Sequence, residues 1–160
     1  MKMLVFSDSH SDTRKMKEAL SLHKNICDAV IFLGDGIRDI NRIKEDYPQI
    51  AFYVVKGNCD LFAGEAEEEM LLSLDGVKIF ITHGHNYGAK GGCGRLAYRA
   101  RELEADAVFF GHTHLPLDNV IEVQGKSIRL FNPGSIGHSG SFGVVNTSGN
   151  VLITSHGKIL

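Results

Sequence analysis

Residues 3–10 read MLVFSDSH, four apolar residues that run directly into the polar sequence Ser7-Asp8-Ser9-His10. The same order recurs along the chain, with apolar or aromatic runs at 30–33, 52–55, 77–81 and 107–110. Those runs lead to Gly34-Asp35, Gly57-Asn58, His83 and Gly111-His112-Thr113-His114. Short apolar runs of this kind are typical of buried strands. Strand ends that meet at one sheet edge are where α/β proteins place their sites, so we expect these polar residues to converge.

The converging residues form a set of candidate metal ligands. The set holds two carboxylates, one amide and four imidazoles: Asp8, Asp35, Asn58, His10, His83, His112 and His114. Oxygen and imidazole donors suit hard-to-borderline divalent metals rather than metals that prefer thiolates. The set is large enough for two ions, and two-metal sites stabilise both the attacking and the leaving oxygen of a phosphoryl displacement.

The first third of the chain alternates strand and helix patterns, which predicts a parallel sheet. A helix is expected from Ser11 or Asp12, with Met16, Ala19, Leu20 and Leu22 on its apolar side. A shorter helix carries Ile37, Ile40 and Ile43 and closes at Pro48.

The second half of the chain is richer in strands. Asp75-Gly76 lies between two apolar runs and predicts a type I′ hairpin. Further hairpins are expected at Gln124-Gly125 and at 148–150, and a helix at 95–104. The residues alone leave open a mixed-sheet sandwich or an open three-layer fold.

Composition narrows the class of protein. The 160 residues fit one domain, 1–160, and carry 17 Lys and Arg against 19 Asp and Glu, for a net charge of -2. The basic residues are dispersed, so we expect no dedicated nucleic-acid-binding patch. Three widely spaced cysteines argue against a disulfide framework. No signal peptide or membrane span is expected, and the predicted location is the cytoplasm.

The five motifs in order, each behind a strand-like run, resemble the calcineurin-like metallophosphoesterase superfamily. The short length, Gly57-Asn58-Cys59-Asp60 and Asn132-Pro133-Gly134-Ser135 resemble its small prokaryotic YfcE-like phosphodiesterase branch. The resemblance covers residues 3 to about 146 and implies an α/β sandwich of two mixed β-sheets flanked by α-helices. It implies one metal on Asp8, His10, Asp35 and His114, and a second on Asp35, Asn58, His83 and His112, with Asp35 bridging the two.

The implied activity is metal-dependent hydrolysis of a small-molecule phosphodiester. A hydroxide that bridges two divalent ions would attack phosphorus in line, with Asp35, Asn58 and His83 as catalytic residues. Mn²⁺ is the ion expected first, and Fe, Co, Ni or Zn ions would also suit the donors. The alternatives are a phosphomonoesterase of the same fold and a non-catalytic scaffold that resembles the retromer subunit. A metallo-β-lactamase-like hydrolase is disfavoured because its His-x-His-x-Asp-His cluster is absent.

One position departs from the family pattern. Many members carry His where this chain has Cys59, and a neutral thiol is a weak proton donor without positive charge. We place Cys59, Asp60 and His85 just outside the direct ligands, with His85 facing either the substrate or solvent.

Other features near the motifs allow simpler readings. The turn with Ser135 either positions a site loop or is an ordinary turn, and the glycines around Lys90 predict a flexible loop flanking the site. His23, His138 and His156 are read as surface or loop residues. An exposed hairpin edge offers a surface for a homodimer.

Overall fold

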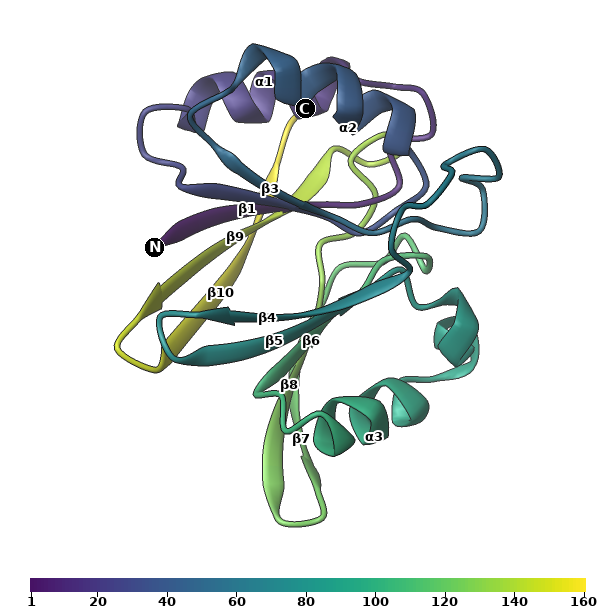
Figure 1. Cartoon of the computed structure of the whole chain (residues 1–160), viewed down its shortest axis with the longest axis vertical. Coiled ribbons are helices and arrows are strands. Elements are labelled where there is room, and N and C mark those ends of the chain that lie inside the picture. The colour runs from purple at the N-terminus through teal and green to yellow at the C-terminus, as the bar shows by residue number, and fades with distance from the viewer.

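The computed structural model describes all 160 residues and consists of two five-stranded mixed sheets packed face to face (Figure 1). The strand order is β10-β9-β1-β2-β3 in the first sheet and β4-β5-β6-β8-β7 in the second. This architecture confirms the predicted sandwich of two mixed sheets and excludes the open three-layer fold.

The first sheet combines a parallel core with an antiparallel hairpin. Its strands are β1 (Lys2–Phe6), β2 (Ala29–Phe32), β3 (Ala51–Val54), β9 (Ser141–Ser148) and β10 (Val151–Lys158). Strands β1, β2 and β3 are parallel, whereas β9 runs antiparallel to both β1 and β10. Two helices, α1 (Arg14–His23) and α2 (Ile37–Ile43), lie over the outer face, and α2 runs on into a 3-10 turn at Lys44–Asp46.

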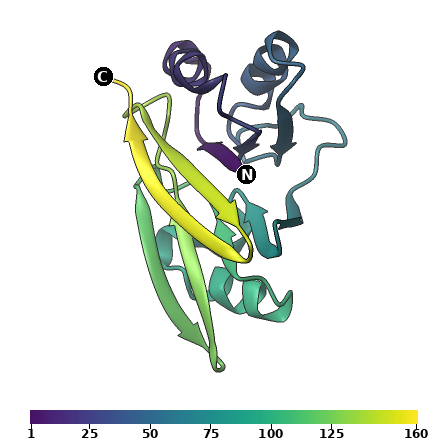
Figure 2. The ribbon, with the colours of Figure 1, turned by 90° about the vertical axis from the view of Figure 1, so that its left-hand side faces the viewer.

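The second sheet has the parallel strands β5 (Val77–Thr82), β6 (Ala107–Phe109) and β8 (Lys126–Asn132) at its centre. The antiparallel strands β4 (Glu69–Leu74) and β7 (Leu117–Val123) lie at its edges. Helix α3 (Gly94–Glu102) covers the outer face of this sheet (Figure 1). Figure 2, turned by 90°, shows the β9–β10 hairpin running alongside β7 and β8. There the Thr154 hydroxyl of β10 accepts a hydrogen bond from Arg129 and donates one to Asp118.

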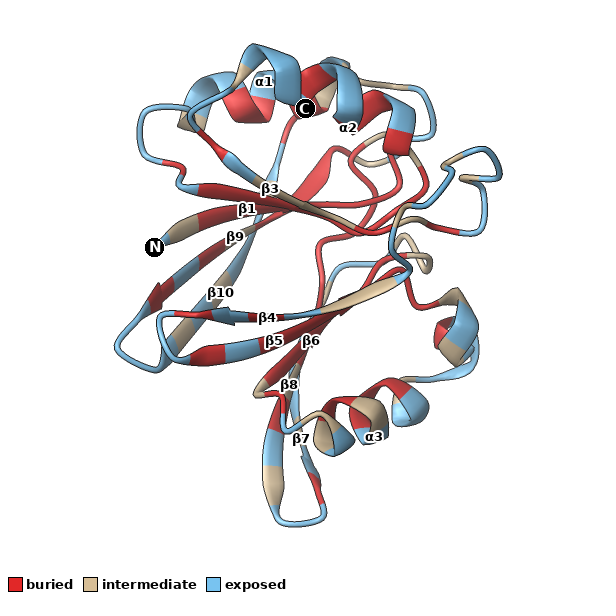
Figure 3. Ribbon diagram, viewed as in Figure 1, coloured by how far each residue is buried: buried red, intermediate tan, exposed pale blue.

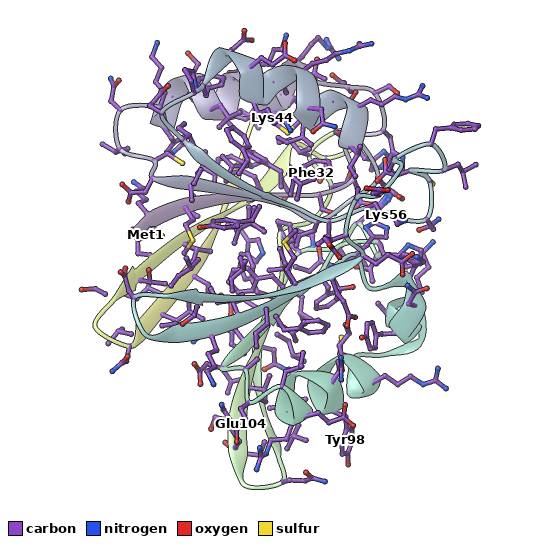
Figure 4. The ribbon with its side chains drawn as sticks, viewed as in Figure 1. Met1, Phe32, Lys44, Lys56, Tyr98 and Glu104 are labelled. Carbon is purple, nitrogen blue, oxygen red and sulfur yellow. The ribbon has the colours of Figure 1, made fainter.

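Alternation along the strands builds a layered core (Figure 3). In β1 and β2, Leu4, Phe6 and Phe32 pack toward the helices, and Figure 4 shows Phe32 in that layer. Their neighbours Val5 and Ile31 pack instead against the second sheet. Both faces of these strands are buried, which explains why their sequences are continuously apolar.

All three predicted hairpins form with two-residue turns. Their central residues all have positive φ: 49° and 80° at Asp75-Gly76, 48° and 77° at Gln124-Gly125, and 53° and 70° at Gly149-Asn150. Positive φ at both positions is what a type I′ turn requires, so this part of the prediction is confirmed.

Several details of the helices differ from the prediction. Helix α1 begins at Arg14, because the Asp12 carboxylate accepts the Arg14 amide in a local turn before the helix. Leu22 is 68% exposed, so it is not part of the helix's apolar face. Helix α3 ends at Glu102, with Glu104 in a left-handed conformation.

The glycine-rich segment before α3 is also more regular than predicted. It contains two 3-10 turns, His85–Tyr87 and Ala89–Gly91, and Ala89 is buried. No helix is long and apolar enough to cross a membrane.

Candidate metal centre

The predicted ligands lie on the loops that follow β1, β2, β3, β5 and β6. These loops gather at the end of the sandwich drawn on the right of Figure 1. Figure 4 places Lys56, which follows β3, at this same end of the molecule. The carboxyl ends of parallel strands in two facing sheets therefore build one site.

Asp8, His10 and His114 form one cluster of donor atoms. His114 Nε2 lies 3.1 Å and His10 Nε2 3.6 Å from Asp8 Oδ1. The two imidazole Nε2 atoms are 3.2 Å apart. All three donor atoms fall within 4.8 Å of one another, a spacing at which a single ion can contact them.

Asp35, His83 and His112 form a second cluster. His83 Nε2 lies 3.3 Å from Asp35 Oδ2, while its Nδ1 lies 2.6 Å from the carbonyl oxygen of Leu33. Because a carbonyl only accepts, Nδ1 carries the proton in the neutral ring and Nε2 keeps its lone pair for a ligand.

Asp35 lies between the two clusters. Its Oδ2 atom is 3.8 Å from His10 Nε2 as well as 3.3 Å from His83 Nε2. Burial raises the pKa of this carboxyl, but the neighbouring His83 imidazole and the backbone N–H of Cys59 outweigh burial and hold the pKa well below its usual range. Burial lowers the pKa of His83, but the Asp35 and Asp8 carboxylates outweigh burial and raise it. A permanently ionised carboxylate in this position suits a bridging ligand.

The arrangement fits divalent metal ions. Asp8 Oδ1 and His83 Nε2 are buried and have no hydrogen-bond partner in the protein. A buried polar atom without a partner is costly, commonly by about 1–3 kcal/mol. Both atoms point into the space that the carboxylates and imidazoles surround, where a cation would satisfy them.

Backbone strain is concentrated at this site. Asp8, His10, Asp35, His112 and His114 all have positive φ, between 44° and 67°. Residues two apart in an extended segment share a face, which would be the simplest way to bring Asp8 and His10 together. Their positive φ values show instead that the two side chains meet through a left-handed turn. Non-glycine residues with positive φ persist where surrounding contacts enforce them, typically at functional sites.

Hydrogen bonds from neighbouring residues enforce these loop conformations. The Asp60 carboxylate accepts the backbone N–H groups of Asp35, Gly36, Ile37 and Gly57 at 2.7–3.0 Å. Asp60 thus holds in place the loop that carries Asp35, the residue predicted to bridge the two ions. Ser135 Oγ donates to the Asp8 carbonyl at 2.8 Å, so its turn does position a site loop.

Two buried braces were missed by sequence reasoning. The Asp39 carboxylate accepts from Ser9 Oγ and the Ser11 amide, and the Asn132 amide donates to the Gly111 carbonyl and Thr113 Oγ1. Asn132 belongs to a motif that had been noted, whereas Asp39 carries no local signal beyond its place in the first turn of α2.

The remaining candidates differ in their distance from the clusters. Cys59 Sγ lies within 4.8 Å of donor atoms of His10 and Asp35, closer than its assigned place outside the ligands. Asn58 is exposed, with its amide nitrogen 3.5 Å from Cys59 Sγ, and its assignment as a ligand stays a prediction. The half-buried His85 ring lies 5.4 Å from His83 between centroids, and its buried Nδ1 has no partner.

One histidine read as a surface residue lies near the site. The ring centroid of His138 is 6.5 Å from that of His114. His138 follows the Ser135 turn that holds the Asp8 loop, and its backbone N–H donates to Ser135 Oγ at 3.0 Å. The turn motif was the signal in the sequence that could have found it.

Comparison with known proteins connects this geometry to a family. Residues 1–150 match the calcineurin-like phosphoesterase superfamily domain. The chain is 39% identical to the probable metallophosphoesterase YsnB of Bacillus subtilis, over 85% of this chain and 75% of that protein. It is 27% identical to phosphodiesterase YfcE of Escherichia coli K12, over 91% and 88% of the two chains.

Solved structures share the fold. A predicted phosphoesterase from Streptococcus pneumoniae superposes with a TM-score of 0.78 at 29% identity, over 98% of this chain and 88% of that one. Vps29 of Entamoeba histolytica gives 0.71 at 23% identity over the full length of both chains, a likeness that shows the fold alone. The match across residues 1–150 and the identity with YsnB show that the chain belongs to the calcineurin-like phosphoesterase superfamily of metal-dependent phosphoester hydrolases.

Proposed function

We propose that this protein hydrolyses small-molecule phosphodiesters with the help of two divalent ions, Mn²⁺ first among them. The observation that carries the proposal is the Asp35 carboxylate, which belongs to the cluster with His83 and His112 and also lies 3.8 Å from His10 of the other cluster. A single ion would use only some of these donors. A carboxylate has two oxygen atoms and can therefore bind two ions at once.

The chain's own residues would hold and orient the ions. Asp8, His10 and His114 would bind one, His83, His112 and Asn58 the other, and Asp35 both. Two bound ions would neutralise charge on the phosphoryl group and lower the pKa of water from about 15.7 toward 7. The Leu33 carbonyl would keep His83 Nε2 aimed at its ion, since it fixes the tautomer and the ring orientation.

The preference for diesters is supported by the charge of the site. Cys59 Sγ lies within 4.8 Å of donor atoms of His10 and Asp35, at the edge of the candidate metal centre. A neutral thiol adds no positive charge for the second anionic oxygen of a phosphomonoester and is a weak donor to a leaving group. The relative YfcE is named as a phosphodiesterase, which agrees with this preference.

The alternatives make different demands on the site. A phosphomonoesterase would need the same donors, whereas a non-catalytic scaffold would need none of them. Buried, unpartnered donors and left-handed ligand residues are costly features for a scaffold to retain. All three cysteines are unpaired, which supports the proposed cytoplasmic location. A homodimer through an exposed hairpin edge stays a prediction.

Metal analysis combined with a substrate panel tests the proposed function. Protein saturated with Mn²⁺ and desalted should hold about two ions per chain and should hydrolyse bis(4-nitrophenyl) phosphate faster than 4-nitrophenyl phosphate. His83→Ala should lose most of this activity, while the matched control His23→Gln, on α1, should keep it. Full activity with a single ion would refute the two-ion proposal. If neither ester is hydrolysed, the proposed activity is refuted and the non-catalytic scaffold becomes the better explanation.

A further inference from the structure

A cavity of about 220 Å³ opens beside the candidate metal centre. One wall is formed by site residues, among them His10, Asp35 and Cys59. The rest of the lining comes from the start of α2 and from the segment after Asp60, and it includes the apolar side chains of Ile37, Leu61, Phe62 and Ala63, here called the apolar wall. A molecule held at the metal centre would therefore have an apolar surface directly beside it.

Leu61 and Phe62 of the apolar wall are exposed to solvent, although Asp60, which precedes them, is held by hydrogen bonds. Leu61 is 81% and Phe62 82% exposed, and Figure 3 shows most of the segment between β3 and β4 as exposed. Asp60, which precedes them, is anchored by its four backbone hydrogen bonds. The segment is closed farther on by the hydrogen bond from the Lys56 amide to the Glu67 carbonyl, at 2.8 Å. Two large apolar side chains are thus displayed to solvent from a braced loop next to the site.

Arg38 gives this pocket its positive charge. It is the only Lys or Arg among the lining residues, and its Cζ atom lies 5.8 Å from the centroid of the Phe62 ring. That distance allows a cation–π contact, which the exposed ring can keep on one face while the other face receives a second flat group. Asp35, Asp39 and Asp60 also line the pocket, but Asp39 and Asp60 accept hydrogen bonds within the protein and Asp35 belongs to the candidate metal centre. Arg38 is therefore the charged group left beside the ring, and it suits an anionic ester that carries a ring.

We propose that this pocket binds an aromatic ester group of the phosphodiester substrate, stacked on Phe62 next to Arg38. The inference rests on the proposed function and names its substrate class: diesters in which at least one alcohol is aromatic or carries a flat ring. The cavity volume of about 220 Å³ lies below the roughly 300–1,000 Å³ that is common in pockets for drug-sized ligands. It therefore suits a single ring system. Stacking on Phe62 should raise kcat/KM for such esters by up to about tenfold, the fold-change expected for an aromatic pair.

Two activated diesters separate this pocket from the chemistry of the site. Bis(4-nitrophenyl) phosphate presents a ring on either side of phosphorus, and bis(2,2,2-trifluoroethyl) phosphate presents none. We expect Phe62→Ala to lower kcat/KM about tenfold on the aryl ester and less than twofold on the aliphatic ester, each relative to the unmodified Mn²⁺-loaded protein. Phe62→Tyr keeps a ring and should restore the preference, and Tyr98→Ala, which removes an exposed aromatic side chain from α3, should change neither rate (Figure 4).

The outcomes distinguish the two proposals. Equal losses on both esters, or no loss on the aryl ester, would overturn the pocket assignment while the phosphodiesterase proposal stands. If the unmodified protein hydrolyses neither ester with its metal bound, the proposed function fails and the pocket assignment fails with it. Because Phe62 is 82% exposed, its replacement should not disturb folding, and an unchanged melting temperature would establish this.

Discussion

Replacing Asp60 by Asn should loosen the loop that carries Asp35. Asp60 Oδ1 accepts the N–H groups of Gly36 and Ile37, and Oδ2 accepts those of Asp35 and Gly57. An asparagine keeps one acceptor oxygen and places an NH₂ donor where the other was. Two of the four backbone donors then face another donor and lose their partner.

The expected cost follows from this geometry. A hydrogen bond to a charged group contributes about 1.5–3 kcal/mol, and partial solvent exposure places these two bonds near the lower end of that range. We therefore expect Asp60→Asn to lower the free energy of unfolding by about 3 kcal/mol. With a urea m-value of about 2 kcal/mol/M, the midpoint should fall by roughly 1.5 M.

Urea unfolding of the metal-free protein measures the effect on stability, and Mn²⁺ titration of the folded variant measures the effect on the site. Asp46→Asn is the matched control, because it makes the same change in charge at an exposed residue without a hydrogen-bond partner. An Asp60→Asn variant that unfolds within about 0.5 kcal/mol of the unmodified protein and binds Mn²⁺ equally well would refute the reasoning.

Three further predictions concern the site. Asp35→Asn should reduce kcat at saturating Mn²⁺ far more than His85→Ala, for which about 10–100-fold is expected outside the direct ligands; the reverse order would show the ligand assignment to be wrong. Cys59→Ala should keep activity on bis(4-nitrophenyl) phosphate within about tenfold, since nitrophenolate leaves with little protonation; complete loss with both ions bound would assign the thiol a chemical role. Gly111→Ala would place Cβ 1.9 Å from Ser7 Oγ and should lower stability by about 1–3 kcal/mol in thermal unfolding, whereas an unchanged melting temperature would mean that the β1 loop yields freely.

The strands and hairpins were predictable because their signals are local. Continuous apolar runs of only four residues, at 3–6, 30–33 and 107–110, are typical of strands buried on both faces. Asp75-Gly76 and Gln124-Gly125 tolerate the positive φ of type I′ turns. The type of metal-binding donor at each strand end was equally predictable, because the chemistry of a carboxylate or an imidazole does not depend on the fold.

Other features depended on which segments the fold brings together. The order β10-β9-β1-β2-β3 and the facing second sheet bring His83 and His112 to Asp35, and no local pattern sets that order. The left-handed turn at Asp8 and His10 is held by distant partners such as Ser135, so no local pattern indicated it.

The pocket between Arg38 and Phe62 likewise exists only after folding. The start of α2 and the segment after Asp60 are separate in the chain, and the hydrogen bonds from the Gly36 and Ile37 amides to the Asp60 carboxylate hold them side by side. The sequence by itself determined the strands, the turns and the donor atoms, since each depends on neighbouring residues. Tertiary structure alone decided the spacing of the donors and the pocket beside them, because those depend on contacts between residues far apart in the chain.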